Sequence, residues 1–373
     1  QGMISFLMSP RLPKFSLAQN KCVYVSLGLV WLTCQPAMAN ESENGQEQEK
    51  SNPIEQLIVT ADQRETTVNE TQYSLSIFQD GDLRRQTDRD LNDLLGRIPN
   101  IEVDPLEGLV IRGLASLGTG GDQRTQLYLI DGAWTPGIFH KWDIDQLEVL
   151  RGAQSTIGSA TSGTFGLRYK EPGFVSSGNM MVSFEPDAND REAGIAFGGP
   201  LIDNQLSYRL AAYSRVNDGL VENQFSGDNG WQNLSEKFAR GKLNWYPHGF
   251  DGDEFALEFY HLNRNTGGSG WINQGSLPED ASNRKTAIER DLYYNVEISD
   301  FRFRYKRQVS PQTTLNLIAS LNVNKSHSLE DRNNQPEDNG FTERGNNNKN
   351  YAISGNLLHD NKNWQWSASF YSF

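Results

Sequence analysis

The sequence predicts a mainly β protein in which a small α+β domain precedes a long antiparallel β region. Three observations support this prediction. Between Leu91 and Gly152, one helical segment is followed by three short strands that end at glycine turns. From Phe174 onward, apolar and polar residues alternate with a period of two, as in strands with one apolar and one polar face. The connections between these later strands alternate between short and long.

The first 53 residues are expected to precede the folded domains. Residues 1–39 contain a basic start, the short apolar run Val23–Thr33 and the cleavage sequence Ala37-Met38-Ala39, so they are predicted to be a secretory signal peptide. The apolar run is shorter than the roughly 20 residues that a spanning helix needs. Residues 40–53 are polar and contain no aromatic residue, which predicts a flexible periplasmic linker.

The composition excludes several classes of protein. The net charge is −13 and the isoelectric point about 4.9, so phosphate neutralisation by clustered cations, and with it nucleic-acid binding, is not expected. A mean hydropathy of −0.62 excludes a bundle of membrane helices. Both cysteines, Cys22 and Cys34, lie in the expected leader, so the mature chain is expected to use no disulfide or thiolate.

The small domain is predicted from a helix and three strands. Leucines at helical spacing predict a helix over Thr87–Ile98, and Pro99 ends it. The first and last of the three strands lead into Arg112-Gly113 and Arg151-Gly152, and the middle one leads into Asp131-Gly132. The strands are expected at Leu109–Arg112, Leu127–Ile130 and Leu147–Leu150.

The alternating region from residue 174 to residue 373 is expected to contain about nine strands. Alternation alone fits both a membrane barrel, with lipid outside and water inside, and a soluble β-sandwich. A phase change near Ser299-Asp300 predicts a β-bulge there. The rhythm of the connections favours the barrel, with short periplasmic turns and long extracellular loops. The short turns are expected at Asp187–Asp190, His248–Asp251, Ser310–Pro311 and Asp360–Asn363, and the long loops at Asn217–Asn233, Asn265–Arg290 and Lys325–Asn347.

Four motifs of the small domain occur in the order IPNI, IRG, YLIDG and LEVLRGAQST. In this order and spacing they resemble the plug domain of TonB-dependent outer-membrane receptors, over residues 54–170. The resemblance implies a small α+β plug domain followed by an incomplete antiparallel transmembrane β-barrel over residues 174–373. Receptors of this family close with more strands, so the chain is expected to be an N-terminal fragment whose sheet is open and curved. The expected location is the Gram-negative outer membrane, in contact with its lipid.

A β-prone run follows the linker and resembles the TonB box of this family. Such a run can add as a strand to the sheet edge of a partner, here the inner-membrane energy-coupling protein TonB. The alternative is that it forms the first strand of the small domain. Its residues are Glu55, Gln56, Leu57, Ile58, Val59, Thr60 and Ala61.

Two plug arginines, Arg112 and Arg151, are singled out by the resemblance, which implies that their carboxylate partners lie on the barrel wall. A partly buried charge needs such a partner. Glu258 and Glu297 are expected to face the lumen and are the candidate partners in this chain. The alternative is a surface role of both arginines within the plug.

The segment Ala133–Trp142 combines aromatic and polar residues. The resemblance implies that apical plug loops face outward and can touch ligand, whereas buried packing is the alternative for these side chains. The candidate ligand-contacting residues are Trp134, Phe139, His140 and Trp142.

No catalytic motif is recognisable, and the five histidines are scattered, with none at metal-ligand spacing. The chain is therefore expected to be no enzyme and to use no metal or cofactor. By resemblance it is expected to import a scarce ligand with energy from TonB, most commonly a ferric siderophore or similar small iron chelate. Cobalamin, haem or a glycan are alternative ligands, and a non-transporting surface-binding protein or adhesin is the alternative function.

Overall fold

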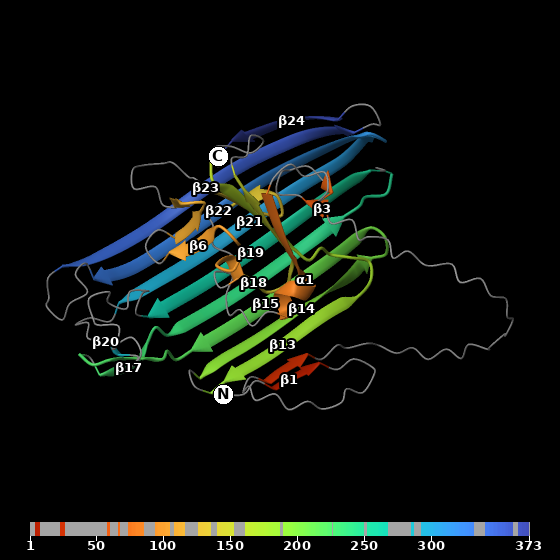
Figure 1. Cartoon of the computed structure of the whole chain (residues 1–373). Helices are drawn as coiled ribbons and strands as arrows, with labels where there is room; N and C mark the ends of the chain where they lie inside the picture. Colours follow the sequence, from red (N-terminus) through yellow and green to blue (C-terminus); the bar gives the residue numbers. More distant parts are fainter. Residues whose placement is uncertain are drawn as a thin grey trace, which may run out of the picture.

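The computed structural model of the chain has a large curved sheet, with smaller sheets lying on its inner side (Figure 1). This architecture confirms the predicted mainly β fold with a small domain and an open antiparallel sheet. The structure describes residues 4–7, 23–26, 58–59, 66–67, 74–85, 94–104, 108–115, 126–135, 140–152, 161–186, 189–225, 227–249, 252–267, 285–286, 292–331, 340–360 and 365–372.

The large sheet contains nine strands, and each pairs antiparallel with the next one along the chain. Among the described residues the first and last strands are the two edges of the sheet, so it is open. The strands are β13 (Ser177–Glu185), β14 (Asp190–Ile202), β15 (Leu206–Asn217), β18 (Leu234–Trp245), β19 (Asp253–Gly267), β21 (Tyr293–Ser310), β22 (Thr313–Asp331), β23 (Phe341–Asp360) and β24 (Gln365–Ser372).

The small domain is built on a five-stranded sheet with the order β10-β9-β12-β11-β5, in which only β12 and β9 are parallel. A short helix, α1, follows β5 in the sequence. Next in the sequence come the three strands β6, β7 and β8, which form a separate sheet. The elements are β5 (Ser74–Gln79), α1 (Asp80–Arg85), β6 (Ile101–Asp104), β7 (Gly108–Ile111), β8 (Leu114–Ala115), β9 (Gln126–Ile130), β10 (Ala133–Trp134), β11 (Ile144–Arg151) and β12 (Gly163–Tyr169).

Two hairpins of this domain turn on two residues with positive φ. The angles are 51° and 80° at Arg112-Gly113, and 49° and 80° at Asp131-Gly132. Such angles at both central residues define the type I′ turn that fits the twist of paired strands. Of the predicted helix over Thr87–Ile98, Leu94 and Leu95 are helical, and the residues before them lie outside the described part.

The remaining strands are short. β1 (Ile4–Leu7) and β2 (Val23–Ser26) are parallel partners within residues 1–39. Three others form a small sheet of their own in the connections of the large sheet, with the order β17-β16-β20. They are β16 (Val221–Asn223), β17 (Asp228–Trp231) and β20 (Lys285–Thr286). No helix in the described part of the chain is long and apolar enough to cross a membrane.

The main hydrophobic core lies between the small domain and the inner face of the large sheet. It joins small-domain residues such as Leu147 and Phe165 to sheet residues such as Phe238 and Val296, and all of them are nearly inaccessible to solvent. Part of the inner wall under the small domain is therefore apolar, and its burial against that domain is favourable.

This core explains why no bulge is present at Ser299-Asp300. The register of β21 with both neighbours runs unbroken through this point. Val296 and Ile298 face inward into the core, whereas Phe301 and Phe303 face outward and are 49% and 41% exposed. The change of phase in the sequence thus reflects two apolar environments, one on each face of the same regular strand.

The short turn expected at Asp187–Asp190 does not lie at the same end of the sheet as the other expected short turns, so this part of the prediction is wrong. The turn joins β13 to β14, and consecutive antiparallel strands place their connections at opposite ends in turn. It therefore lies at the same end as the long connections before β18, β21 and β23. The first turn at the opposite end joins β14 to β15 after Ile202.

Candidate functional site

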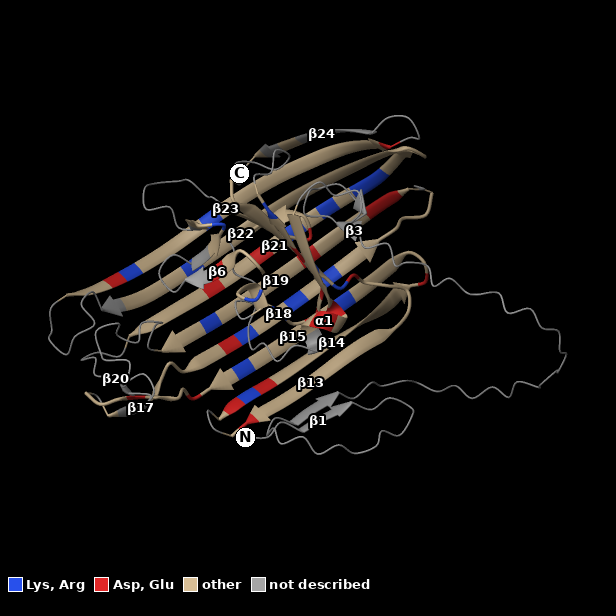
Figure 2. Ribbon diagram, viewed as in Figure 1, with Lys and Arg blue, Asp and Glu red and all other residues tan. Residues whose placement is uncertain are grey.

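The interface between the small domain and the large sheet is rich in buried charge. Figure 2 shows basic and acidic residues on the strands of the large sheet behind the small domain. The described basic side chains at this interface come mainly from the sheet, and the acidic ones that meet them come from turns of the small domain and the segment after it.

Asp143 and Arg209 form a buried pair, and Arg240 Nη1 lies 3.8 Å from the same carboxylate. Arg209 Nε donates to Asp143 Oδ2 over 2.6 Å, and its Nη2 group contacts Oδ1 of the same carboxylate. Their side chains are 0% and 4% exposed. Asp143 precedes β11 with a φ of 66°, and Arg209 lies on the inner face of β15. A two-point contact of this kind fixes both position and orientation of the groups.

Asp131, at the tip of the β9–β10 hairpin, approaches two cations of β18. Its Oδ2 lies 3.4 Å from Lys242 Nζ and 3.7 Å from Arg240 Nη2. Arg240 Nε also donates to Glu258 Oε1 over 2.5 Å, and Arg302 Nη1 lies 3.2 Å from Glu258 Oε2. Burial raises the pKa of Asp131, while Lys242 acts in the opposite direction. The hairpin tip is therefore part of a buried network that continues into the sheet.

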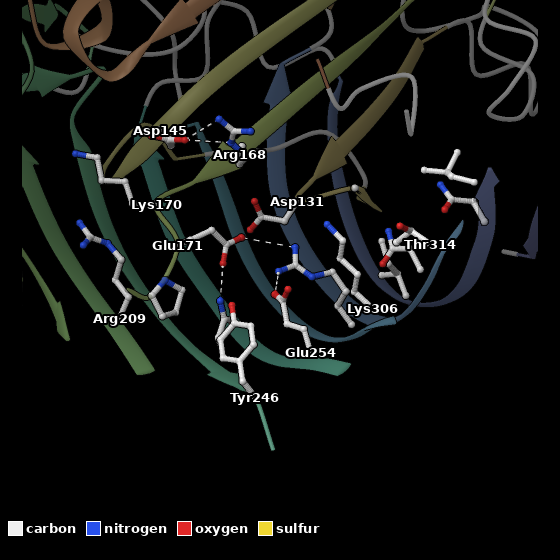
Figure 3. Close-up of a pocket in the computed structure, with 18 of the residues that line it drawn as sticks. Asp131, Asp145, Arg168, Lys170, Glu171, Arg209, Tyr246, Glu254, Lys306 and Thr314 are labelled. Atoms are coloured by element: carbon white, nitrogen blue, oxygen red, sulfur yellow. Dashed lines mark hydrogen bonds and ion pairs between the residues drawn. The ribbon is translucent and has the colours of Figure 1, made fainter. Parts of the chain in front are cut away.

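Glu171 follows β12 and links the small domain to the same network. It accepts from Lys242 Nζ over 2.6 Å and from Asn244 Nδ2 over 3.1 Å. Its Oε1 lies 3.6 Å from Arg304 Nη1 on β21. These contacts border a cavity of about 700 Å³ between the Asp131-Gly132 turn and the sheet, with several charged side chains in its wall (Figure 3). The cavity lies toward the end of the sheet that carries the short turns, because its wall includes Tyr246 after β18 and the start of β22.

His140 is held between two aromatic rings of the sheet. Its ring centroid lies 4.3 Å from that of Tyr213 and 4.5 Å from that of Phe238. Nδ1 accepts from the Trp142 backbone N–H over 3.0 Å, and Nε2 lies 3.0 Å from Glu236 Oε1. These partners fit a neutral ring with its proton on Nε2, and burial lowers the pKa of His140.

The other candidate aromatic residues also lie at this interface. Trp142 Nε1 donates to the Ile195 carbonyl oxygen over 3.1 Å, and a Cβ placed on Gly194 would lie 2.8 Å from the indole. Trp134 is buried in a cluster with Leu127, Leu129 and Ala352. Phe139 lies outside the described residues. The contacts of the three described aromatic residues are thus packing contacts between small domain and sheet.

Among the described residues, neither Arg112 nor Arg151 contacts Glu258 or Glu297. Arg151 Nη1 donates to the Pro99 carbonyl oxygen over 2.9 Å, and Arg112 lies beside Gly152, so both contacts are internal to the small domain. Burial and then Arg112 lower the pKa of Arg151. Glu258 is buried between sheet arginines, whereas Glu297 faces outward, 3.5 Å from Lys325.

The ion pairs that join the small domain to the large sheet have the reverse polarity of the predicted ones: the carboxylates lie on the small domain and the cations on the sheet. Sequence reasoning missed Asp131, Asp143 and Glu171 on the small domain and Arg209 and Lys242 on the sheet. The sequence did contain one indication of the sheet residues: Arg209 and Lys242 lie in the polar phase of alternating strands, which predicts that both side chains face inward. Of the run Glu55–Ala61, the structure describes Ile58-Val59, which form β3 and pair antiparallel with β4 (Thr66–Thr67).

A small domain fixed by buried ion pairs to the inner face of an antiparallel sheet, whose outer face is apolar, is the arrangement of a plugged barrel wall. Residues 67–164 match the family model described as TonB-dependent Receptor Plug Domain. The small domain is therefore similar to this plug domain, and the chain shares the fold of a plug followed by part of a barrel.

Solved structures of siderophore receptors share this fold. The ferric yersiniabactin uptake receptor FyuA of Yersinia pestis superposes with a TM-score of 0.70 at 14% identity, over 80% of this chain and 48% of that one. The siderophore receptor PirA of Acinetobacter baumannii gives 0.63 at 16%, over 84% and 49%. FpvA of Pseudomonas aeruginosa, bound to heterologous pyoverdines, gives 0.64 at 13%, over 84% and 44%. The chain spans about half the length of these structures.

Proposed function

We propose that the chain is part of an outer-membrane receptor that imports a scarce ligand with energy supplied through TonB. The observation that carries the proposal is the buried ionic interface, which seats the plug on the inner wall at Asp131, Asp143 and Glu171. Breaking a buried ion pair by removing one partner costs about 3–5 kcal/mol. A plug held by several such contacts does not open the lumen by thermal motion alone, so passage of ligand requires work.

The run Glu55–Ala61 is the proposed point at which TonB applies that work. It precedes the plug along the chain, and its Ile58-Val59 backbone already adopts the strand conformation that β-augmentation uses. Residues 1–39 are the proposed signal peptide and residues 40–53 the proposed periplasmic linker. A pull on the linker side would reach the plug first through β5, the edge strand of its sheet.

A small ferric chelate is the proposed ligand. Support comes from the solved receptors of similar fold, which are described as taking up ferric yersiniabactin or as siderophore receptors. Arg112 and Arg151 are further proposed to meet carboxylates of the barrel wall. In support, Arg151 Nε is buried without a hydrogen-bond partner among the described residues, and a second arginine lies beside it.

Deletion of Glu55–Ala61 tests the transport proposal. In cells that lack other iron receptors, this deletion is expected to abolish uptake of a radiolabelled ferric siderophore that the receptor binds, while leaving surface binding intact. A seven-residue deletion in the polar linker, Asn40–Gln46, is the matched control and is expected to preserve both. Uptake that survives loss of the box would refute energy-coupled import and favour a surface-binding protein or adhesin.

A further inference from the structure

The inner face of β22 and β23 carries a run of uncharged polar side chains. Residues paired across two strands point to the same side of a sheet, and every second residue of each strand shares that side. Three successive inward pairs consist of amides and one hydroxyl, and we call these six residues the amide ladder. The pairs are Asn322 with Asn350, Asn324 with Asn348, and Ser326 with Asn346.

Contacts with the small domain establish the face and the position of the amide ladder. A Cβ placed on Gly132 would lie 3.3 Å from Ile318 Cδ1, and Trp134 shares a buried cluster with Ala352. Ile318 and Ala352 therefore face the small domain, and the ladder continues on the same face toward the long connection between β22 and β23. Asn348 is exposed, so no described residue covers this part of the wall.

The inner face of these two strands is uncharged over a long stretch. No inward residue from Thr314 to Ser326 on β22, or from Asn346 to Leu358 on β23, is charged. The neighbouring inner wall is different, because β15, β18 and β21 place cations there, and those cations contact carboxylates of the small domain and of Glu171. The ladder therefore offers a ligand polar groups that no ion pair occupies.

The amides of the ladder have unused hydrogen-bonding groups. Each amide has two N–H donors and an acceptor oxygen. Among the described residues, the side chains of Asn348 and Asn350 have no hydrogen-bond partner. Asn322 Nδ2 donates to Asp300 Oδ2 over 3.3 Å, and its Oδ1 is buried without a partner among the same residues. The ladder can therefore both donate to and accept from a bound group, and it brings no charge of its own.

These properties favour a ligand without net charge. Carbonyl, N–H and hydroxyl groups satisfy an amide in both directions, whereas an anion accepts from its N–H groups only and leaves its oxygen facing a negative charge. A charge that is taken from water without a compensating partner is costly. The chain as a whole has a net charge of −13, so its field does not supply the missing attraction for an anion.

We infer that the amide ladder selects a ferric chelate without net charge, in which three hydroxamates hold the iron. Three singly charged hydroxamates cancel the charge of ferric iron, whereas three doubly charged catecholates leave a trianion. Carbonyl and N–H groups at the periphery of the neutral chelate bind Asn348, Asn350 and their cross-strand partners. The inference rests on the proposed function, because it takes the ligand to be a ferric chelate that enters the lumen from the end with the long connections.

Binding of two chelates to the purified full-length receptor in detergent tests this selection. The probes are ferrichrome, a neutral ferric tris-hydroxamate, and ferric enterobactin, a trianionic ferric tris-catecholate. Loss of one hydrogen bond changes affinity about fivefold, so N348A/N350A is expected to weaken ferrichrome binding roughly 25-fold. N347A is the matched control, because Asn347 lies on the outer face of the same strand, opposite Lys325, and it is expected to change nothing.

Lysine at the same two positions is expected to reverse the preference. N348K/N350K places two cations on the inner face and is expected to bind ferric enterobactin about tenfold more tightly than wild type does, because opposite charges then meet. N347K places its cation on the outer face and is expected to bring no gain. A gain of affinity requires a folded receptor, so this arm separates selection by charge from damage to the wall.

Wild-type receptor that binds ferric enterobactin as tightly as ferrichrome would overturn the inference. Equal affinity of wild type and N348A/N350A for ferrichrome would also overturn it, and both outcomes leave energy-coupled import standing. Uptake that survives deletion of Glu55–Ala61 overturns the transport function instead. That deletion does not alter the ladder, so the preference for the neutral chelate measured in detergent still supports the inference.

Discussion

Neutralising Asp143 should loosen the plug far more than neutralising Asp145, two residues further along the same segment. D143N keeps the shape of the side chain, and asparagine tolerates the positive φ of 66° at this position. The substitution leaves the buried Arg209 guanidinium without its carboxylate. Removing one partner of a buried pair costs about 3–5 kcal/mol.

Asp145 provides the matched control because its ion pair is exposed. It lies 2.9 Å from Arg168, with side chains 44% and 29% exposed. An exposed pair contributes about 0–1 kcal/mol, so D145N is expected to have little effect. The difference between the two variants is therefore about 3 kcal/mol, although each removes one negative charge from the same edge of the plug.

Hydrogen exchange of the β11 backbone amides in the full-length receptor measures this difference. A loss of about 3 kcal/mol corresponds to roughly 150-fold faster exchange in D143N, whereas D145N is expected to change the rate by about fivefold or less. The double variant D143N/R209M removes both charges and is expected to recover most of the loss. Equal effects of D143N and D145N, or no recovery in the double variant, would refute the assignment of Asp143 as a buried anchor.

Two further predictions use the same interface. E258Q is expected to destabilise the wall by about 3 kcal/mol, because the buried Arg240 and Arg302 both lose a carboxylate contact, although Arg302 keeps its contact with Asp300. E297Q is expected to cost less than about 1 kcal/mol. Denaturant unfolding of the two variants compares them, and a larger effect of E297Q would contradict the assignment. Burial depresses the pKa of His140 in the folded protein. The stability that the neutral ring contributes is therefore fully present above the unfolded-state pKa of about 6.5, and it is lost as the pH falls from there toward the folded-state pKa. Amide exchange at the interface is expected to accelerate from pH 7 to pH 5.5, after correction for intrinsic rates, and H140Q is expected to flatten this dependence; an unchanged slope in H140Q would exclude the role of His140.

The strands could be predicted from the sequence because every second residue of a strand faces outward, and these outward residues are apolar. Leu206–Tyr213 and Phe255–Tyr260 show this alternation, and both face as their polarity predicts. The β21 strand did not follow the rule, since Val296 and Ile298 are apolar and inward. Their environment is created by the plug, which is distant in the sequence, so no local pattern could distinguish this packing from a bulge.

The charged contacts were harder to predict, because alternation gives the face of a residue but not its partner. Arg209 and Lys242 fall in the polar phase, and the water-filled lumen of a barrel would satisfy them equally well. Their partners Asp143 and Asp131 lie in turns whose positive φ values suit Asp for local reasons. The pairing of these cations with these aspartates becomes apparent only when the plug is packed against the sheet. The complementary charges therefore act only in the assembled interface, where Asp143 lies against Arg209 and within 3.8 Å of Arg240.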